Sequence, residues 1–61
     1  MNILNLKVAR VKKGLTQKEL AELIGVSPSM INRIETGKQI PKVDILLKLA
    51  EILEVSVEEL L

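Results

Sequence analysis

Closely spaced signals in this sequence end one helix and begin the next. Gly14 follows two lysines, and this pattern is typical of helix C-termini, where Gly takes the left-handed backbone and cations suit the helix dipole. Thr16 and Glu19 have the spacing of a capping box, in which each side chain bonds the other residue's backbone N–H. Ser27-Pro28 indicates another helix start, because Ser caps well and Pro suits the first helical position. No sustained two-residue alternation is found, so the sequence predicts an all-α fold.

These signals predict five short helices joined by tight turns, within about 2–13, 16–25, 27–37, 43–53 and 56–61, the last opened by a second capping box at 56–59. Each helix is too short to be stable alone, so tertiary packing must hold them together. The expected core is aliphatic and consists of Leu6, Ala9, Leu15, Leu20, Leu23, Ile24, Val26, Ile31, Ile34, Val43, Leu46, Leu49, Ala50, Leu53, Val55, Val57 and Leu60.

Composition excludes several classes of site. The 61 residues include no Cys and no His, so disulfides, zinc fingers, thiol catalysis and imidazole chemistry are ruled out. With no aromatic residue, the chain cannot stack bases on rings. The sequence shows no nucleophile–base pair, metal cluster or phosphate loop, so we expect no enzyme, no metal, no cofactor and no small-molecule substrate. The length predicts one domain over residues 1–61.

Neither a membrane span nor an export signal is recognisable. No apolar run approaches the roughly 20 residues that cross a bilayer, and the N-terminus lacks the pattern of a signal peptide. We therefore expect a cytoplasmic protein with no membrane partner.

Residues 16–37 have the spacing of a helix-turn-helix, whose two helices span about 16–36. A capped helix of about eight residues ends at Gly25, and a second begins three residues later. The second helix places Ile31 and Ile34 inward. Its outward residues are small or hydrogen-bonding, and no acid precedes Glu35, so this face is suited to the major groove of DNA; the outward residues are Pro28, Ser29, Asn32 and Arg33.

The segment GLTQKELAELIGVS at 14–27 resembles the phage repressor and Cro-type (Xre-like) helix-turn-helix family. Further similarity lies at 34–38, at Pro41, at 49–50 and at 55–60, so it covers essentially the whole chain. The resemblance implies a compact five-helix repressor-like DNA-binding domain. It also implies a transcriptional regulator, most simply a repressor that binds double-stranded DNA as a homodimer. The operator would be near-palindromic, with half-sites about 34–36 Å apart.

The resemblance assigns roles to individual residues. The expected base contacts are Pro28, Ser29, Asn32 and Arg33. Arg33 is the best base reader, because its guanidinium matches guanine O6 and N7, whereas Asn32 could read adenine or bind phosphate. The expected phosphate contacts are Thr16, Gln17, Ser27, Thr36, Lys38 and Lys42. Arg10 and Glu35 fall where the family pairs a first-helix Arg with a third-helix Glu in a largely buried salt bridge.

Three features depart from the family pattern. Glu54 stands where Gly is usual, so it must either adopt a left-handed backbone or end the helix differently. Lys42 stands where a small capping residue is usual. Leu4, Val8 and Val11 form an apolar stripe on a first-helix face that is usually polar. The stripe is either an extra interface with a domain, partner or second copy, or part of a larger core.

Two functions other than regulation therefore remain open. The chain could be an antitoxin-like or other protein-interaction module with the same fold, or a helical fragment without DNA affinity.

The net charge of +1 by itself argues against a nucleic-acid binder, since such proteins are usually basic. However, residues 1–42 hold eight basic residues and three acids, a net charge of +5, and residues 43–61 hold one basic residue and five acids, a net charge of −4. Because the basic part contains the helix-turn-helix, we expect the acidic C-terminal helices to point away from phosphate.

Overall fold

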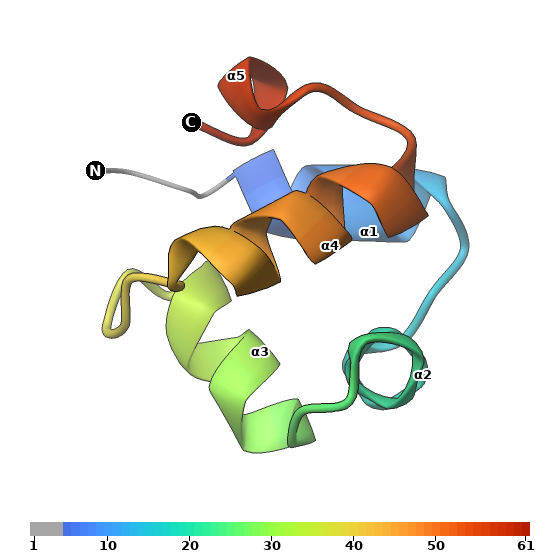
Figure 1. The fold of residues 1–61 in the computed structure, drawn as a ribbon. Coiled ribbons are helices and arrows are strands. Elements are labelled where there is room, and N and C mark those ends of the chain that lie inside the picture. Colours follow the sequence, from blue (N-terminus) through green and yellow to red (C-terminus); the bar gives the residue numbers. More distant parts are fainter. Residues whose placement is uncertain (1–4) are drawn as a thin grey trace.

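The computed structural model describes residues 5–61, and five helices account for most of them (Figure 1). They are α1 (Asn5–Lys12), α2 (Gln17–Ile24), α3 (Pro28–Glu35), α4 (Val43–Leu53) and α5 (Val57–Leu60). No strand occurs in this part of the chain, so the all-α, five-helix prediction is confirmed. The expected start of the first helix near Asn2 lies outside the described residues. None of the described helices is long and apolar enough to cross a membrane.

The predicted capping signals determine where α2 and α3 begin and where α2 ends. Thr16 Oγ1 accepts a hydrogen bond from Glu19 N at 3.0 Å, and Glu19 Oε1 accepts one from Thr16 N at 2.9 Å, which completes the capping box. Gly25 ends α2 in the left-handed conformation, with a φ of 78°. Ser27 Oγ caps α3 by accepting from Met30 N at 3.2 Å. These boundaries therefore follow from local hydrogen bonding.

The C-terminal helices begin less regularly than predicted. Ser56 Oγ accepts from Glu59 N at 3.2 Å, but within residues 5–61 no reciprocal bond runs from Ser56 N to the Glu59 carboxylate, so the second capping box is only half formed. The N-cap of α4, Lys42, makes no side-chain capping bond. Of the two alternatives for Glu54, the left-handed one is correct, since its φ is 56°.

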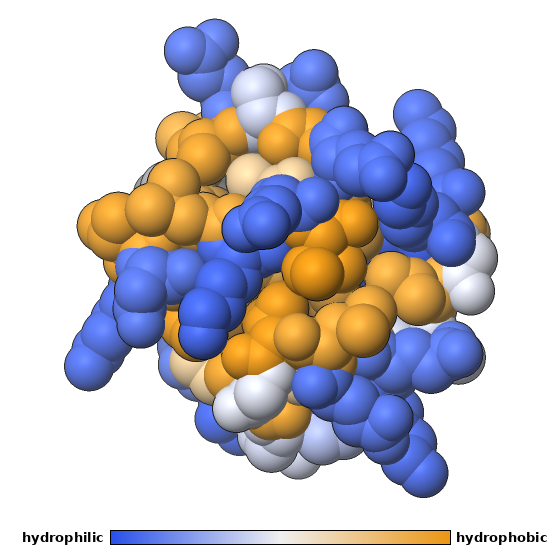
Figure 2. All heavy atoms as spheres, turned by 45° about the vertical axis from the view of Figure 1, so that its right-hand side comes forward, coloured by the Kyte–Doolittle hydropathy of each residue, from blue (hydrophilic) through white to orange (hydrophobic). Residues whose placement is uncertain are grey.

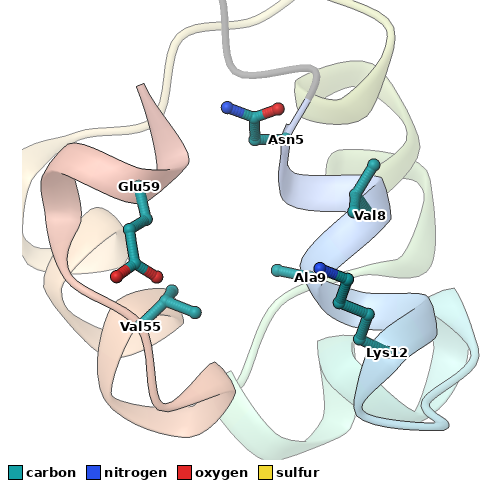
Figure 3. A pocket seen from close by; sticks show the side chains of 6 residues that line it. All are labelled: Asn5, Val8, Ala9, Lys12, Val55 and Glu59. Atoms are coloured by element: carbon teal, nitrogen blue, oxygen red, sulfur yellow. The ribbon is translucent and has the colours of Figure 1, made fainter.

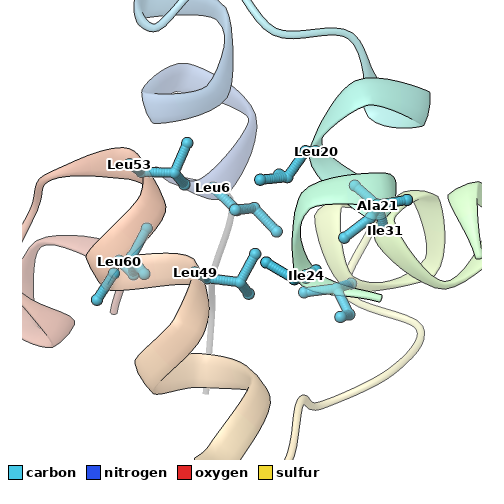
Figure 4. Close-up of a cluster of buried hydrophobic side chains, with 10 residues drawn as sticks. Leu6, Leu20, Ala21, Ile24, Ile31, Leu49, Leu53 and Leu60 are labelled. Atoms are coloured by element: carbon cyan, nitrogen blue, oxygen red, sulfur yellow. The ribbon is translucent and has the colours of Figure 1, made fainter. Parts of the chain in front are cut away.

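All five helices contribute side chains to one core, and those in Figure 4 point toward a common centre. Six side chains are almost completely excluded from solvent, namely Leu6, Leu20, Ile31, Ile34, Leu49 and Leu60. Burial of this aliphatic surface holds together helices that are individually too short to be stable.

Two residues expected in the core are exposed, and two residues outside the expected core, Ala21 and Pro41, are buried. Leu23 is 57% exposed, because the helical repeat of 3.6 residues places it just beyond the Leu20 edge of the buried α2 face of Leu20, Ala21 and Ile24. Val43 is 71% exposed, since it opens α4 before the buried part of that helix begins. In contrast, Pro41 in the connection between α3 and α4 is buried.

The surface is mixed, with hydrophobic patches between hydrophilic side chains on the face shown in Figure 2. Val8 and Val11 on α1 are 52% and 59% exposed. The alternative in which this α1 stripe joins an enlarged core is therefore wrong for both valines. Leu4, the third member of the stripe, lies outside the described residues.

Candidate nucleic-acid interface

A hollow on the protein surface lies between the first residue of α2 and the exposed face of α3. Its volume is about 410 Å³, and the residues that line it are Gln17, Pro28, Ser29, Asn32 and Arg33. The packing of α2 against α3 brings the first residue of α2 next to the exposed face of α3. All four residues expected to contact bases thus lie in one hollow together with one expected phosphate contact, and no carboxylate lines it.

Arg33 is exposed near the end of α3, and a residue of the following connection holds its guanidinium. Arg33 Nε donates a hydrogen bond to Gln39 Oε1 at 2.8 Å. The Arg33 carbonyl also accepts from the backbone N–H groups of Lys38 at 2.8 Å and Gln39 at 3.2 Å. Sequence analysis missed Gln39, because nothing in the local pattern indicates a side-chain contact six residues away across the Gly37 turn.

Arg10 and Glu35 form an ion pair between α1 and α3. Arg10 Nε lies 2.6 Å from Glu35 Oε2, and Arg10 Nη2 donates to Glu35 Oε1 at 3.3 Å. Both residues are buried, at 9% and 5% exposure. Arg10 Nη1 also donates to the Leu15 carbonyl at 2.7 Å, so the guanidinium also stabilises the connection between α1 and α2.

Gln17 joins the same network. Its Nε2 donates to Glu35 Oε1 at 2.9 Å. An amide nitrogen carries two hydrogens, so one N–H of Gln17 is used inside the protein and the other remains for an external acceptor. The contact holds the side chain at the N-terminus of α2, where the helix dipole favours anions.

The three hydroxyls among the expected phosphate contacts differ in what they can still donate. Thr16 Oγ1 and Ser27 Oγ act as acceptors from backbone N–H groups, so each keeps its own O–H proton. Thr36 Oγ1 instead donates to the Asn32 carbonyl at 3.0 Å, which uses its proton at the end of α3. Two of the three hydroxyls can therefore donate to phosphate without losing a bond.

The expected lysine contacts, Lys38 and Lys42, are exposed in the connection between α3 and α4. Lys13, in contrast, forms a surface ion pair with Glu54, with Nζ 2.8 Å from Oε2. The hydrogen bond and charge of Lys13 lower the pKa of Glu54 from its ordinary value of 4.5. Lys38 and Lys42 form no ion pair with another residue of 5–61.

A second hollow lies between α1 and α5 (Figure 3). Its volume is about 230 Å³. One wall comes from α1 and includes Val8, and the other comes from the chain around α5; the lining residues are Asn5, Val8, Ala9, Lys12, Val55 and Glu59. Among residues 5–61, no group of three or more His, Cys, Asp or Glu side chains could hold a metal ion.

Comparison with known proteins identifies the family. Residues 6–60 match the model of a helix-turn-helix family. The chain is 34% identical over 55 residues to the HTH-type transcriptional regulator YazB of Bacillus subtilis, covering 90% of this chain and 80% of the relative. It is also 34% identical over 56 residues to the transcriptional repressor RstR of the cryptic phage CTXphi in Vibrio cholerae, covering 88% of this chain and 50% of the repressor.

A solved structure agrees with these sequence matches. Bacillus thuringiensis PlcR, in complex with the peptide PapR7 and DNA, superimposes with a TM-score of 0.84 at 37% identity, covering 98% of this chain and 22% of that chain. This chain thus spans half or less of the phage repressor and of PlcR, but most of YazB. The match to the family model over residues 6–60 shows that the chain belongs to the helix-turn-helix family of DNA-binding transcriptional regulators.

Proposed function

We propose that this chain is a sequence-specific repressor that binds a near-palindromic operator in double-stranded DNA as a homodimer. The observation that carries the proposal is the hollow between the start of α2 and the exposed face of α3. It gathers Gln17, Pro28, Ser29, Asn32 and Arg33 and contains no carboxylate. Its polar groups are hydrogen-bond donors or neutral amides and hydroxyls, which suit the base edges and phosphates of a major groove.

In this arrangement α3 enters the major groove. Arg33 donates to O6 and N7 of a guanine, and Asn32 reads adenine or binds phosphate. Residues around the rim bind the backbone through the hydroxyls of Thr16 and Ser27, the free N–H of Gln17 and the ammonium groups of Lys38 and Lys42. Because the hydroxyl proton and the backbone N–H of Thr36 both donate inside the protein, Thr36 supports phosphate binding only by holding the end of α3.

The repressor and dimer assignments have separate support. Similarity to a phage repressor supports repression. A dimer fits because a single helix reads few base pairs, and two-fold symmetry lets two copies of α3 enter successive major grooves about 34–36 Å apart. The proposal assigns no catalysis and no cofactor, and it places the protein in the cytoplasm with the DNA.

Selection of bound sequences from a random DNA pool tests this function. We expect an inverted repeat to be enriched. On the enriched site, Arg33→Ala should weaken binding by about 1–3 kcal/mol and relax the preference at one base position. Lys48→Ala, which removes an exposed lysine from α4, is the control and should leave that preference unchanged. A pool that shows no enrichment would overturn sequence-specific binding.

The competing function is a protein-interaction module, and the exposure of Val8 and Val11 supports it. The two functions differ in the response to salt. If the protein binds DNA, the logarithm of its affinity should fall linearly with the logarithm of the salt concentration, because lysines that bind phosphates release counterions. If no complex with DNA forms even at low salt, the interaction module becomes the better assignment.

A further inference from the structure

We infer that Gln39 is a specificity-determining residue that acts by positioning Arg33 for guanine. The inference rests on the proposed function, because it concerns how the same interface chooses its base. Gln39 does not line the hollow, and the proposal assigns it no base contact of its own. It acts through the 2.8 Å hydrogen bond that its Oε1 accepts from Arg33 Nε.

The geometry of this bond selects which edge of the guanidinium faces DNA. A guanidinium has five N–H donors in a rigid plane. With the single Nε–H directed to Gln39, the four N–H groups on Nη1 and Nη2 remain, and together they form the end of the fork. That end can pair with guanine O6 and N7. The side-on pairing that uses Nε is no longer available, so Gln39 restricts Arg33 to one of two bidentate modes.

The same bond reduces the entropy lost when DNA binds. Arg33 is exposed, and an exposed arginine has many rotamers to lose. Ordering a flexible side chain at an interface costs about 0.5–1.5 kcal/mol. Gln39 already orders the guanidinium in the free protein. The free-energy cost of ordering Arg33 is therefore part of folding and does not reduce the affinity for DNA.

The position of Gln39 does not depend on its side chain. Backbone N–H groups of Lys38 and Gln39 donate to the Arg33 carbonyl, and Gly37 supplies the left-handed residue of the turn with a φ of 77°. Any residue other than proline at position 39 keeps these bonds. The side chain can therefore be changed without opening the connection between α3 and α4, and its amide is free to serve recognition.

Two near-isosteric variants separate acceptor chemistry from side-chain bulk. Gln39→Met keeps the length of the side chain and removes the acceptor, whereas Gln39→Glu keeps an oxygen that can accept from Nε. We measure affinity for the selected operator and for the same operator with the Arg33-contacted guanine replaced. Gln39→Met should lower this discrimination by about 2–10-fold, the factor that corresponds to the ordering cost of one side chain. Thermal unfolding should remain unchanged.

Gln39→Glu should retain the discrimination while weakening binding to both sequences equally, because its added negative charge repels phosphate. Ile40→Ala is the matched control, since it truncates the neighbouring residue, which is 63% exposed. It should leave the discrimination unchanged. A readout without DNA is the exchange rate of the Arg33 Nε–H proton, which should be slower in the wild type and Gln39→Glu than in Gln39→Met.

The outcomes separate this inference from the proposed function. If Arg33→Ala abolishes the guanine preference but Gln39→Met keeps it in full, the positioning role is overturned and the proposed function stands. Equal Nε–H exchange in wild type and Gln39→Met would likewise overturn the positioning role. If the wild type shows no sequence preference, both the proposed function and this inference fail.

Discussion

Glu35 is the residue at which the first three helices meet. Its carboxylate accepts hydrogen bonds from Arg10 on α1 and from Gln17 on α2, and it belongs to α3 itself. Within residues 5–61, every buried side-chain nitrogen and oxygen has a hydrogen-bond partner, so the charge of Glu35 is compensated inside the protein. The ion pair thereby fixes α3 relative to α1, and Gln17 links it to the hollow that Gln17 lines together with α3.

Removing one partner of this pair should lower the stability of the folded protein. Arg10→Ala leaves the Glu35 carboxylate buried without its cation, and we expect the free energy of unfolding to fall by about 3–5 kcal/mol. Urea unfolding followed by circular dichroism measures this loss. Lys12→Ala, at an exposed position of the same helix, is the control and should change stability by less than about 0.5 kcal/mol. An Arg10→Ala protein as stable as the wild type would disprove a stabilising role for the pair.

Glu54 carries the single left-handed backbone found at a non-glycine residue between positions 5 and 61. A side chain in this conformation is strained, whereas glycine adopts it freely. We therefore expect Glu54→Gly to raise Tm by about 4–8 °C, as measured by thermal unfolding. Glu54→Ala tests the reason, because it also loses the Lys13 ion pair but keeps the strained backbone. A rise in Tm for both variants would argue against backbone strain as the cause.

At the scale of the element, α2 depends on its first turn. The capping box satisfies two backbone N–H groups that would otherwise lack partners, those of Thr16 and Glu19. The helix has only eight residues, so little cooperative stabilisation compensates for a frayed end. The first residue after the cap is Gln17, and the hollow depends on the correct start of α2.

Loss of the cap should therefore affect both stability and DNA binding. Thr16→Ala should reduce the free energy of unfolding by about 1 kcal/mol and weaken DNA binding, since it also removes a hydroxyl proposed to bind phosphate. Thr16→Ser retains the hydroxyl and should preserve both properties. Urea unfolding and fluorescence anisotropy with labelled operator measure the two effects. If Thr16→Ser lost as much stability as Thr16→Ala, the hydroxyl would not be the stabilising group.

The capping box also predicts a dependence on pH. The backbone N–H of Thr16, and secondarily its side chain, lowers the pKa of Glu19 below the ordinary value of 4.5. A carboxyl whose pKa is lower in the folded state stabilises the fold above its unfolded pKa, and this stabilisation is lost as the pH falls through the folded pKa. We expect unfolding titrations to show stability decreasing below about pH 4.5. The stability of the Glu19→Gln variant should decrease less steeply over that range. A pH profile of stability identical to that of the wild type would contradict the prediction.

At the scale of the whole molecule, charge is distributed unevenly between the first 42 residues and the rest of the chain. Figure 1 shows α5, which carries Glu58 and Glu59, at the end of the molecule opposite α2 and the start of α3. The excess of basic residues belongs to residues 1–42 and the excess of acids to residues 43–61. Arg33 thus lines the hollow, whereas Glu58 and Glu59 lie far from it. The basic residues of α1 are closer to the acids, since Lys12 and Glu59 line the second hollow and Lys13 pairs with Glu54.

Salt titrations should reveal this polarity. Lys38→Ala should reduce the slope of log affinity against log salt by about 1 per subunit, because one fewer phosphate is neutralised. Glu58→Ala changes the net charge by a similar amount at the opposite end and should leave the slope unaltered. Fluorescence anisotropy between low and physiological salt measures both slopes. Equal slopes for Lys38→Ala and the wild type would remove Lys38 from the phosphate contacts.

Helix boundaries were largely predictable from the sequence, because they depend on neighbouring residues. Thr16, Gly25 and Ser27 act through bonds to groups three or four positions away, and such spacing can be read along the chain. The core was predicted less completely. Leu23 and Val43 satisfy an apolar pattern yet face solvent, since a pattern does not show where the next helix packs.

The sequence by itself determined the five-helix framework and the helix-turn-helix, because capping and periodicity are local properties, and the resemblance of its motifs indicated the family. Only the tertiary structure decided that Gln17 bonds Glu35, that Lys13 pairs with Glu54 and that Gln39 holds Arg33. These contacts join residues separated by 18, 41 and 6 positions, and they form only after packing brings separate elements together. A side chain's partner across a turn or a helix interface depends on that packing, which no local pattern encodes.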